Sequence, residues 1–267
     1  MNLERTLVIA PHPDDDVIGA GGLIQRVLSI GGQVHVVFVT DGDNNPWPQR
    51  WIRRKWTITA ADRAAFGALR RDEAHDSLTS LAVTSAATTF LGLPDQGVGK
   101  LIRGGDTRLL QALRKVVVEF NPTLIVSPSS RDLHNDHRAI AWCAHVAAAG
   151  EIPITTYVVH GEGNARRIAI RIELTENEQR RKSAAIECHE SQLVLSRDRF
   201  LSYVRPTESF YTAEYDLIAV ESASRARFGS LLHALHVVFG SYPVPAPSGV
   251  KPAADVHDRP GDVPGLL

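Results

Sequence analysis

The stretch RTLVIAPHPDDD, residues 5–16, decides the fold because a short apolar run ends abruptly and an imidazole and three carboxylates follow it. Residues 6–10 are apolar or β-branched on both faces, as expected of a strand buried in a parallel sheet. Pro11 and Pro13 restrict the backbone where this strand ends. The pattern predicts a buried strand whose carboxyl end delivers the polar side chains of residues 12–16.

A second polar cluster follows a second apolar run. Leu124-Ile125-Val126 leads through the turn 127–130 to His134-Asn135-Asp136-His137. In open α/β sheets, ligands bind at the carboxyl ends of the strands. We therefore expect the two clusters to lie together in space although they are far apart in the sequence.

The donor types in the two clusters fit a catalytic zinc site. Such a site takes three protein ligands from His, Asp, Glu or Cys and leaves one position open for water. His12, Asp15 and His137 meet that count, and the spacing from His12 to Asp15 suits a tight turn. Asp14 is then available as a general base for the attacking water, so the clusters predict hydrolysis of an amide or an ester.

His134 and Asp136 complete the predicted catalytic set. His134 precedes His137 by three residues, so it can face the substrate and stabilise an oxyanion or protonate a leaving amine. Asp136 can orient one of the histidines through its second ring nitrogen. Taken singly, each cluster also fits a solvated turn or a helix cap, and Asp16 is a candidate cap for a helix that begins near Val17. The two clusters together favour the metal site.

Alternating strand and helix patterns predict one α/β domain, Rossmann-like, with a mainly parallel sheet flanked by helices and the active site at the carboxyl ends of the strands. The expected strands are residues 6–10, 33–40, 88–91, 124–127 and 154–159. The expected helices begin near residue 17 or span 70–81, 107–120, 138–149 and, from the capping box Thr175-x-x-Glu178, 175 to about 190. The domain is predicted to span 1–241, and the Pro- and Gly-rich residues 242–267 to form a disordered tail or an extended arm on a neighbour.

Composition excludes several classes of function. The chain has 29 basic and 30 acidic residues, so its net charge of −1 provides no general attraction to nucleic acid or an anionic membrane. Cys143 and Cys188 lie on expected helices without metal-ligand spacing, which favours small buried thiols in a reduced, cytoplasmic compartment over a disulfide. We expect no signal peptide and no transmembrane segment, because no apolar run approaches about 20 residues. A homo-oligomer is left open.

Residues 44–57 form a segment rich in tryptophan and arginine. Trp47, Trp51 and Trp56 are three of the four tryptophans, and Arg50 and three further cations lie among them. In a substrate lid, Trp47 would stack on a sugar ring and Arg50 would bind an anionic group. The alternatives are an amphipathic segment whose tryptophans pack inward, and a subunit interface.

Taken together, these motifs resemble the PIG-L/LmbE-like zinc-dependent N-deacetylases, which remove acetyl groups from N-acetylglucosamine-type sugars. The resemblance runs in order along residues 5–215 through the following segments: Pro11–Asp15, Arg70-Arg71-Asp72-Glu73 as a helix start, Phe90–Asp95, His134–His137, and Lys182 with His189-Glu190-Ser191-Gln192. The chain departs from the family at Asp16, where the family usually has Glu, so the reach of that carboxylate is one methylene shorter.

The resemblance implies a role for each matching residue. By similarity, His12, Asp15 and His137 are the zinc ligands, Asp14 the general base, His134 the electrophilic histidine, Asp136 its acidic partner and Arg70 a substrate contact. Zn²⁺ is the expected cofactor, with Fe²⁺ and Co²⁺ as alternatives. The expected substrate is a small N-acetylated sugar or sugar conjugate. The alternatives are another amide, such as an N-acylated antibiotic or a thiol-sugar intermediate, and a non-catalytic metal- or glycan-binding module.

Overall fold

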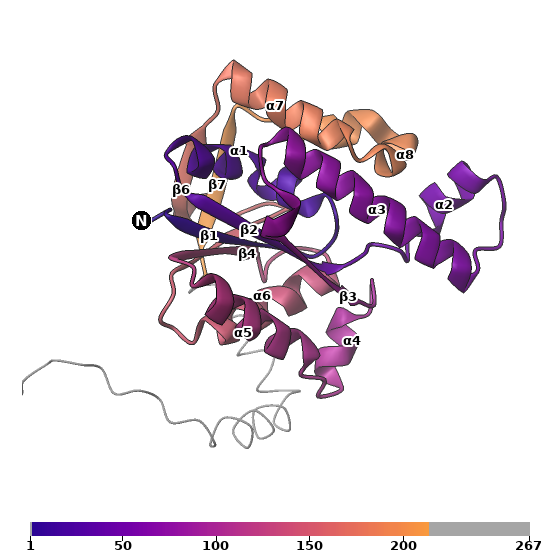
Figure 1. Cartoon of the computed structure of the whole chain (residues 1–267), viewed down its shortest axis with the longest axis horizontal. Helices are drawn as coiled ribbons and strands as arrows, with labels where there is room; N and C mark the ends of the chain where they lie inside the picture. The colour runs from indigo at the N-terminus through magenta and orange to yellow at the C-terminus, as the bar shows by residue number, and fades with distance from the viewer. Residues whose placement is uncertain (1, 214–267) are drawn as a thin grey trace, which may run out of the picture.

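A central sheet organises the computed structural model, which describes residues 2–213. Its seven strands are β1 (Arg5–Ala10), β2 (Gln33–Thr40), β3 (Thr88–Leu93), β4 (Leu124–Pro128), β5 (Ile154–Tyr157), β6 (Ile168–Glu173) and β7 (Thr207–Thr212). Their order in the sheet is β3-β2-β1-β4-β5-β7-β6, and the first five run parallel (Figure 1). β7 is antiparallel to both β5 and β6. The predicted α/β class with a mainly parallel sheet is confirmed.

Helices cover both faces of this sheet. They are α1 (Asp15–Ser29), α2 (Pro46–Arg53), α3 (Ala60–Ser80), α4 (Val98–Arg103), α5 (Arg108–Phe120), α6 (Asn135–Ala148), α7 (Glu176–Glu187) and α8 (Glu190–Leu201). Figure 1 shows α1, α3, α7 and α8 on one face and α4, α5 and α6 on the other. Successive strand residues point to opposite faces, so Val8 of β1 joins the core under the first group and Leu7 and Ile9 the core under the second.

Three helices begin two or more residues before the expected position, and one of them is α6, which begins at Asn135 instead of residue 138. α3 begins at Ala60, ten residues before Arg70, because Thr59 and Asp62 form a capping box at its amino end. The motif Arg70–Glu73 therefore lies inside a helix and does not start one. α1 begins at Asp15, with Asp14 in the N-cap position, so Asp16 lies inside the first turn and does not cap the helix.

Residues after 160 contain elements that the sequence analysis did not predict. β6 carries its isoleucines at 168, 170 and 172, an alternation typical of a half-buried strand, and it pairs with β7. The capping box at Thr175 and Glu178 is confirmed, but α7 ends at Glu187 and α8 follows almost at once. The boundary at residue 241 and the tail 242–267 lie outside the described residues.

Two further expectations can be compared with the structure. Cys143 is buried, Cys188 is partly buried, and both are free thiols, as predicted. Within residues 2–213, no helix is both long and apolar enough to cross a bilayer.

A buried ion pair joins the antiparallel strands to the first helix. Lys182 Nζ lies 2.6 Å from Glu208 Oε1 and donates to the Ile18 carbonyl at 2.9 Å. The Glu208 carboxylate also accepts from the backbone N–H groups of Gly22 and Leu23 at 2.7 and 3.0 Å. α7 and β7 are thereby fixed against α1, the helix that follows the first polar cluster.

We expect Lys182→Met to lower the free energy of unfolding by about 3–5 kcal/mol, because Glu208 would then be a buried charge without its cation. The control is Lys115→Met, which removes an exposed lysine paired with Glu119 and should cost less than about 1 kcal/mol. Urea denaturation of both variants measures the difference. Equal losses in the two variants would show that the buried pair has no special weight.

Candidate metal and catalytic site

The two polar clusters meet at the carboxyl ends of β1 and β4. The ligand atoms of His12, Asp15 and His137 all lie within 4.8 Å of one another. Asp15 Oδ2 is 2.9 Å from His12 Nδ1 and 3.2 Å from His137 Nε2. The turn is tight because the backbone N–H of Asp15 donates to the His12 carbonyl, while the His12 N–H donates to the Asp15 carboxylate. The predicted convergence is confirmed.

These three side chains have the donor set and the surroundings of a divalent metal site. Two imidazoles and one carboxylate match the ligands that zinc takes in catalytic sites. His137 Nε2 is buried without a hydrogen bond, although the Asp15 carboxylate lies beside it. A ring nitrogen that faces a carboxylate oxygen across such a gap has the arrangement expected of two ligands that share one ion.

A second carboxylate faces the outer nitrogen of each histidine. Asp95 Oδ1 lies 3.1 Å from His12 Nε2, and Asp132 Oδ2 lies 3.1 Å from His137 Nδ1. Metal-binding histidines commonly have such a partner, which fixes the orientation and tautomer of the ring. In the metal-free protein, burial lowers the pKa of each histidine, but contacts with Asp15 and these carboxylates raise it, to about 10 for His12 and about 9 for His137. Both rings must lose a proton before they bind an ion.

Asp132 was not identified from the sequence. It is buried, and its carboxylate accepts from the backbone N–H groups of His134, Val159 and His160 at 2.9–3.0 Å. It therefore connects the loop after β5 to the start of α6. The available signal was an acidic residue in the same turn, five positions before His137. For His137, Asp132 occupies the orienting position that the sequence analysis gave to Asp136.

Asp136 lies on the other side of the cluster. Its carboxylate accepts from the Gly99 N–H at 3.3 Å, and one of its oxygens lies within 4.8 Å of ring nitrogens of both His12 and His134. His134 Nδ1 accepts from the Asp136 backbone N–H at 3.3 Å. The His134 ring lies 5.0 Å from that of His12 and 5.7 Å from that of His160, so three imidazoles border one space.

Asp14 is adjacent to the ligand cluster but outside it. Its Oδ2 lies 2.9 Å from a terminal nitrogen of Arg70. The same nitrogen donates to the Pro13 carbonyl, and the other terminal nitrogen of Arg70 donates to the Gly42 carbonyl. Burial raises the pKa of Asp14 to about 7, and the positive charge of Arg70 opposes that rise. Arg70, predicted as a substrate contact, borders the site, but its guanidinium is buried and bound to these groups. It positions Asp14.

A pocket of about 260 Å³ opens over this cluster. Its lining comprises the predicted residues His12, Asp14, Asp15, Arg70 and His134, the additional residues Ile18, Asn45, Asp95, Gln96, Val159 and His160, and the α8 side Gln192, Leu195, Ser196, Arg199, Phe200 and Tyr203. The motif that ends at Gln192 reached the start of the α8 side, but no motif pointed to His160 or to the rest of that side. The active site therefore lies at the strand ends, as predicted, and α8, a helix far along the chain, forms one wall of its pocket.

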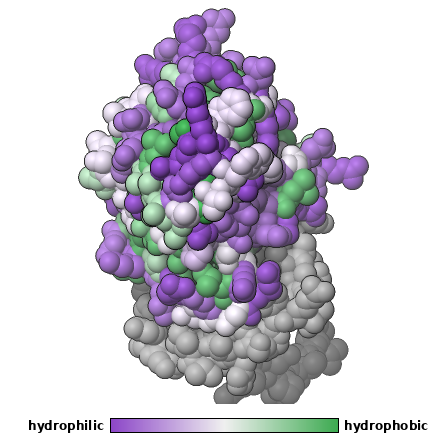
Figure 2. All heavy atoms as spheres, turned by 90° about the vertical axis from the view of Figure 1, so that its right-hand side faces the viewer, coloured by the Kyte–Doolittle hydropathy of each residue, from purple (hydrophilic) through white to green (hydrophobic). Residues whose placement is uncertain are grey.

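Trp47 and Arg50 do not line this pocket. They line a neighbouring hollow of about 330 Å³ that shares Leu195 with it. Both residues belong to α2, which lies on the right of Figure 1, the side that faces the viewer in Figure 2. Trp47, Trp51 and Trp56 are 58%, 68% and 77% exposed, so the reading in which the tryptophans pack inward is wrong. The Arg50 guanidinium lies 4.9 and 5.4 Å from the ring centroids of Trp47 and Trp56.

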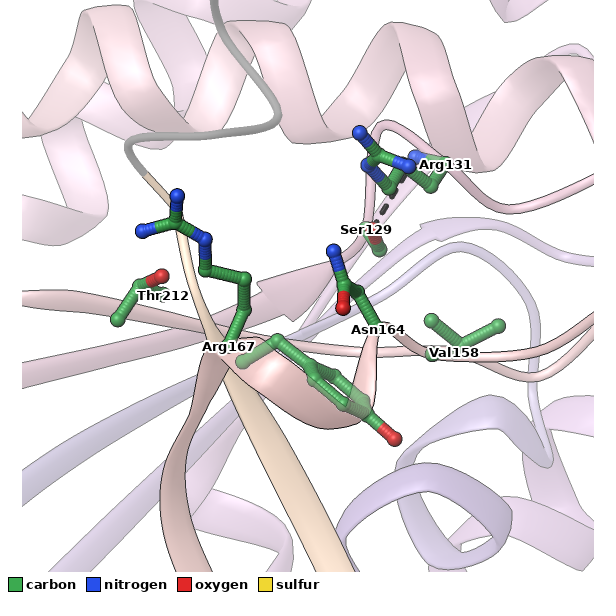
Figure 3. Close-up of a pocket in the computed structure, with 8 residues that line it drawn as sticks. Ser129, Arg131, Val158, Asn164, Arg167 and Thr212 are labelled. Carbon is green, nitrogen blue, oxygen red and sulfur yellow. Dashed lines mark hydrogen bonds between the residues drawn. The ribbon is translucent and has the colours of Figure 1, made fainter.

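A separate small hollow lies near the ends of β4 and β7 (Figure 3). Its lining is Ser129, Arg131, Val158, Gly163, Asn164, Arg167, Tyr211 and Thr212. Its volume of about 10 Å³ is enough for a single water molecule. Because this lining contains no His, Cys, Asp or Glu, the candidate site is the larger pocket over His12, Asp15 and His137.

Comparison with known families agrees with this assignment. The model of the family described as PIG-L: GlcNAc-PI de-N-acetylase matches residues 7–148, which is more than half of the chain. The chain belongs to the PIG-L family. The matched region contains all three proposed ligands, and the resemblance seen in the sequence motifs is confirmed.

Individual relatives are more distant. A 1D-myo-inositol 2-acetamido-2-deoxy-alpha-D-glucopyranoside deacetylase from Rhodococcus jostii strain RHA1 is 29% identical over 167 residues, covering 56% of each chain. The chain thus spans about half the length of the curated relatives it matches. The N,N'-diacetylchitobiose deacetylase from Pyrococcus horikoshii has a TM-score of 0.58 at 24% identity, covering 78% of this chain and 82% of that one.

A third match shows that the fold alone does not fix the chemistry. The 4-carboxy-2-hydroxymuconate hydratase from Pseudomonas putida KT2440 has a TM-score of 0.57 at 20% identity, covering 94% of this chain and 100% of that one. Likeness at these identities establishes the fold, and the function has to be argued from the residues of the site.

We expect Asp132→Asn to weaken zinc binding about 10–100-fold without unfolding the chain, because His137 would lose the carboxylate that orients its ring. Competition with a chromophoric chelator measures the affinity. The control is Asp106→Asn, which changes an exposed carboxylate paired with Arg108 and should leave metal affinity unchanged. Unchanged affinity in Asp132→Asn would remove Asp132 from the support of the metal site.

Proposed function

We propose that this chain is a metal-dependent hydrolase that removes the N-acetyl group from an N-acetylglucosamine-type sugar or sugar conjugate. The observation that carries the proposal is Asp14, a buried carboxylate beside the His12–Asp15–His137 cluster but not part of it. A structural metal site fills its coordination positions with protein ligands and has no use for a spare base. The family match supports the same reading.

His12, Asp15 and His137 would hold the metal ion. Zn²⁺ is the default ion for this donor set, and Fe²⁺ or Co²⁺ can occupy the same ligands. When bound, such an ion polarises a carbonyl group and lowers the pKa of a coordinated water. The second carboxylates, Asp95 and Asp132, keep the two rings in position for this role.

The chain's own groups would then manage the protons. Asp14, held by Arg70, takes a proton from the attacking water while the water's oxygen forms a bond to the acetamide carbon. The carbon–nitrogen bond breaks, acetate departs, and the amine leaves with a proton. His134 accepts a backbone hydrogen bond at Nδ1, so its Nε2 is the ring nitrogen available to donate to the oxyanion or to the leaving amine.

The pocket limits the size of the reacting group. Its volume of about 260 Å³ lies just below the usual range for ligand sites, which begins at about 300 Å³, and it suits one sugar ring with its acetamide. Further parts of a conjugate would extend outward past Leu195, toward the hollow lined by Trp47, Arg50 and Trp56. We propose that this hollow binds the distal part of the substrate, with an indole face against a sugar and Arg50 held between two tryptophans.

Replacing Asp14 with Asn should leave metal bound while kcat falls by about 10²–10⁴, since the side chain keeps its size but cannot take a proton. The assay is acetate release from a panel of N-acetylated sugars and conjugates by metal-stripped and zinc-restored protein. Asp16→Asn is the matched control, because Asp16 lies two residues further along, is also buried, and does not line the pocket.

Four results would contradict parts of this proposal. Loss of metal from Asp14→Asn would make Asp14 a ligand, and an undiminished kcat would exclude it as the base. Metal binding by the wild-type protein without acetate release from any substrate would favour the non-catalytic module. Release from N-acylated compounds other than sugars would favour the alternative amide.

For the hollow, we expect Trp47→Ala or Arg50→Ala to raise KM while metal content is retained, because these residues contact the substrate away from the reacting carbonyl. Leu69→Ala, an exposed apolar residue on α3, is the control. Unchanged kinetics together with a change in oligomeric state, measured by light scattering, would instead identify the surface as a subunit interface.

A further inference from the structure

One face of the α8 segment forms a wall of the metal pocket. The lining residues occur at intervals of three and four, as Gln192, Leu195, Ser196, Arg199, Phe200 and Tyr203. Within each half of the segment, this spacing places side chains on one side of the helical turns. The helix is interrupted at Ser196, whose φ of −166° and ψ of 79° are not helical, so its second half continues in a new direction along the pocket.

Both ends of this wall are fixed to the rest of the fold. At its start, the Glu73 carboxylate accepts from the Ser191 N–H at 2.7 Å and from the Ser191 hydroxyl at 2.6 Å. At its end, the Tyr203 hydroxyl donates to the Val159 carbonyl at 3.3 Å, and the Phe200 and Tyr203 rings pack against the core. The backbone of Arg199 is therefore held in place beside the pocket.

Arg199 is a cation of the pocket lining whose guanidinium has no partner among the described residues. Among residues 2–213, no ion pair or side-chain hydrogen bond is formed by its guanidinium, whereas Arg70 is bound by Asp14 and two carbonyls. The pocket's carboxylates are engaged as well, because Asp15 and Asp95 both contact His12. Burial lowers the pKa of His160, and the nearby positive charge of Arg199 lowers it further.

We infer that Arg199 forms a subsite for a negatively charged group of the substrate, with the Phe200 and Tyr203 rings beside it. The planar guanidinium of an arginine can donate two parallel hydrogen bonds to a phosphate or a carboxylate, because each presents a pair of anionic oxygens. Resting on the proposed function, this assigns the substrate to N-acetylated sugars that carry an anionic substituent. The metal site would act on the acetamide while Arg199 selects the sugar by its charge.

The test compares matched sugars with zinc-loaded protein. Methyl N-acetylglucosaminide is the neutral member, and its 6-phosphate and its 6-carboxylate, the uronic acid, are the charged members; N-acetylglucosamine 1-phosphate moves the charge to the anomeric position. We expect kcat/KM to favour at least one charged sugar by about 10-fold or more, the worth of a hydrogen bond to a charged group. The charged sugar with the higher kcat/KM shows whether the group is a phosphate or a carboxylate, and at which position of the sugar it lies.

Arg199→Gln should abolish this preference by lowering kcat/KM for the charged sugar far more than for the neutral sugar, while Arg199→Lys should retain part of the preference. The matched control is Arg197→Gln, because Arg197 lies on the same helix but pairs with Glu187 and does not line the pocket. Salt should weaken the preference in the wild type and not in Arg199→Gln.

Calorimetric binding of the same sugars separates this inference from the proposed function. If no sugar releases acetate, the hydrolase proposal fails, and a charge preference in binding that Arg199→Gln removes would still support the subsite. Equal ratios of charged to neutral sugar in the wild type and Arg199→Gln, in both binding and kcat/KM, would overturn it. The subsite proposal would also be overturned if Arg197→Gln lost the charge preference to the same extent as Arg199→Gln.

Discussion

The buried guanidinium of Arg70 is the contact on which the arrangement of the site depends. It reaches the Asp14 carboxylate and the carbonyls of Pro13 and Gly42, and so joins the loop after β1 to the loop after β2. Gly42 has a φ of 60° and no side chain, and a Cβ there would overlap the guanidinium. Three residues along the same helix, Glu73 binds Ser191 at the start of α8. One turn of α3 thereby fixes the position of the proposed base relative to the pocket wall.

The convergence of His12, Asp15 and His137 was predictable because sheet topology brings strand ends together whatever the sequence separation. The role of the motif Arg70–Glu73 was less accessible, since its distance from the capping box at Thr59 hid its place inside a long helix. Asp95 supports His12 through a contact between distant segments, which no local spacing encodes, and Asp132 lies five residues before His137 but outside the quoted motif. Beyond Gln192, the α8 wall was missed for a related reason, because it depends on how a late helix packs across the sheet.

Catalysis and selection are assigned to different parts of the chain. The groups proposed for chemistry lie on the turns and first helical residues that follow the central, buried strands β1 and β4, where side chains have little freedom to move. The groups proposed for substrate choice lie on α2 and on the second half of α8, where side chains are exposed and the helix is interrupted. Surface positions of this kind tolerate substitution more easily than core positions. A family built in this way can change its substrate while its metal site stays the same.

Asp14 has a backbone φ of 128°, a region that residues with a side chain rarely occupy. Its conformation costs about 1–3 kcal/mol relative to an ordinary one, and the surrounding contacts must supply that energy. Glycine would relieve the strain, so a selection for thermal resistance alone would favour losing the carboxylate at this position. At Asp14, thermal stability and catalytic turnover therefore place opposite demands on the same residue.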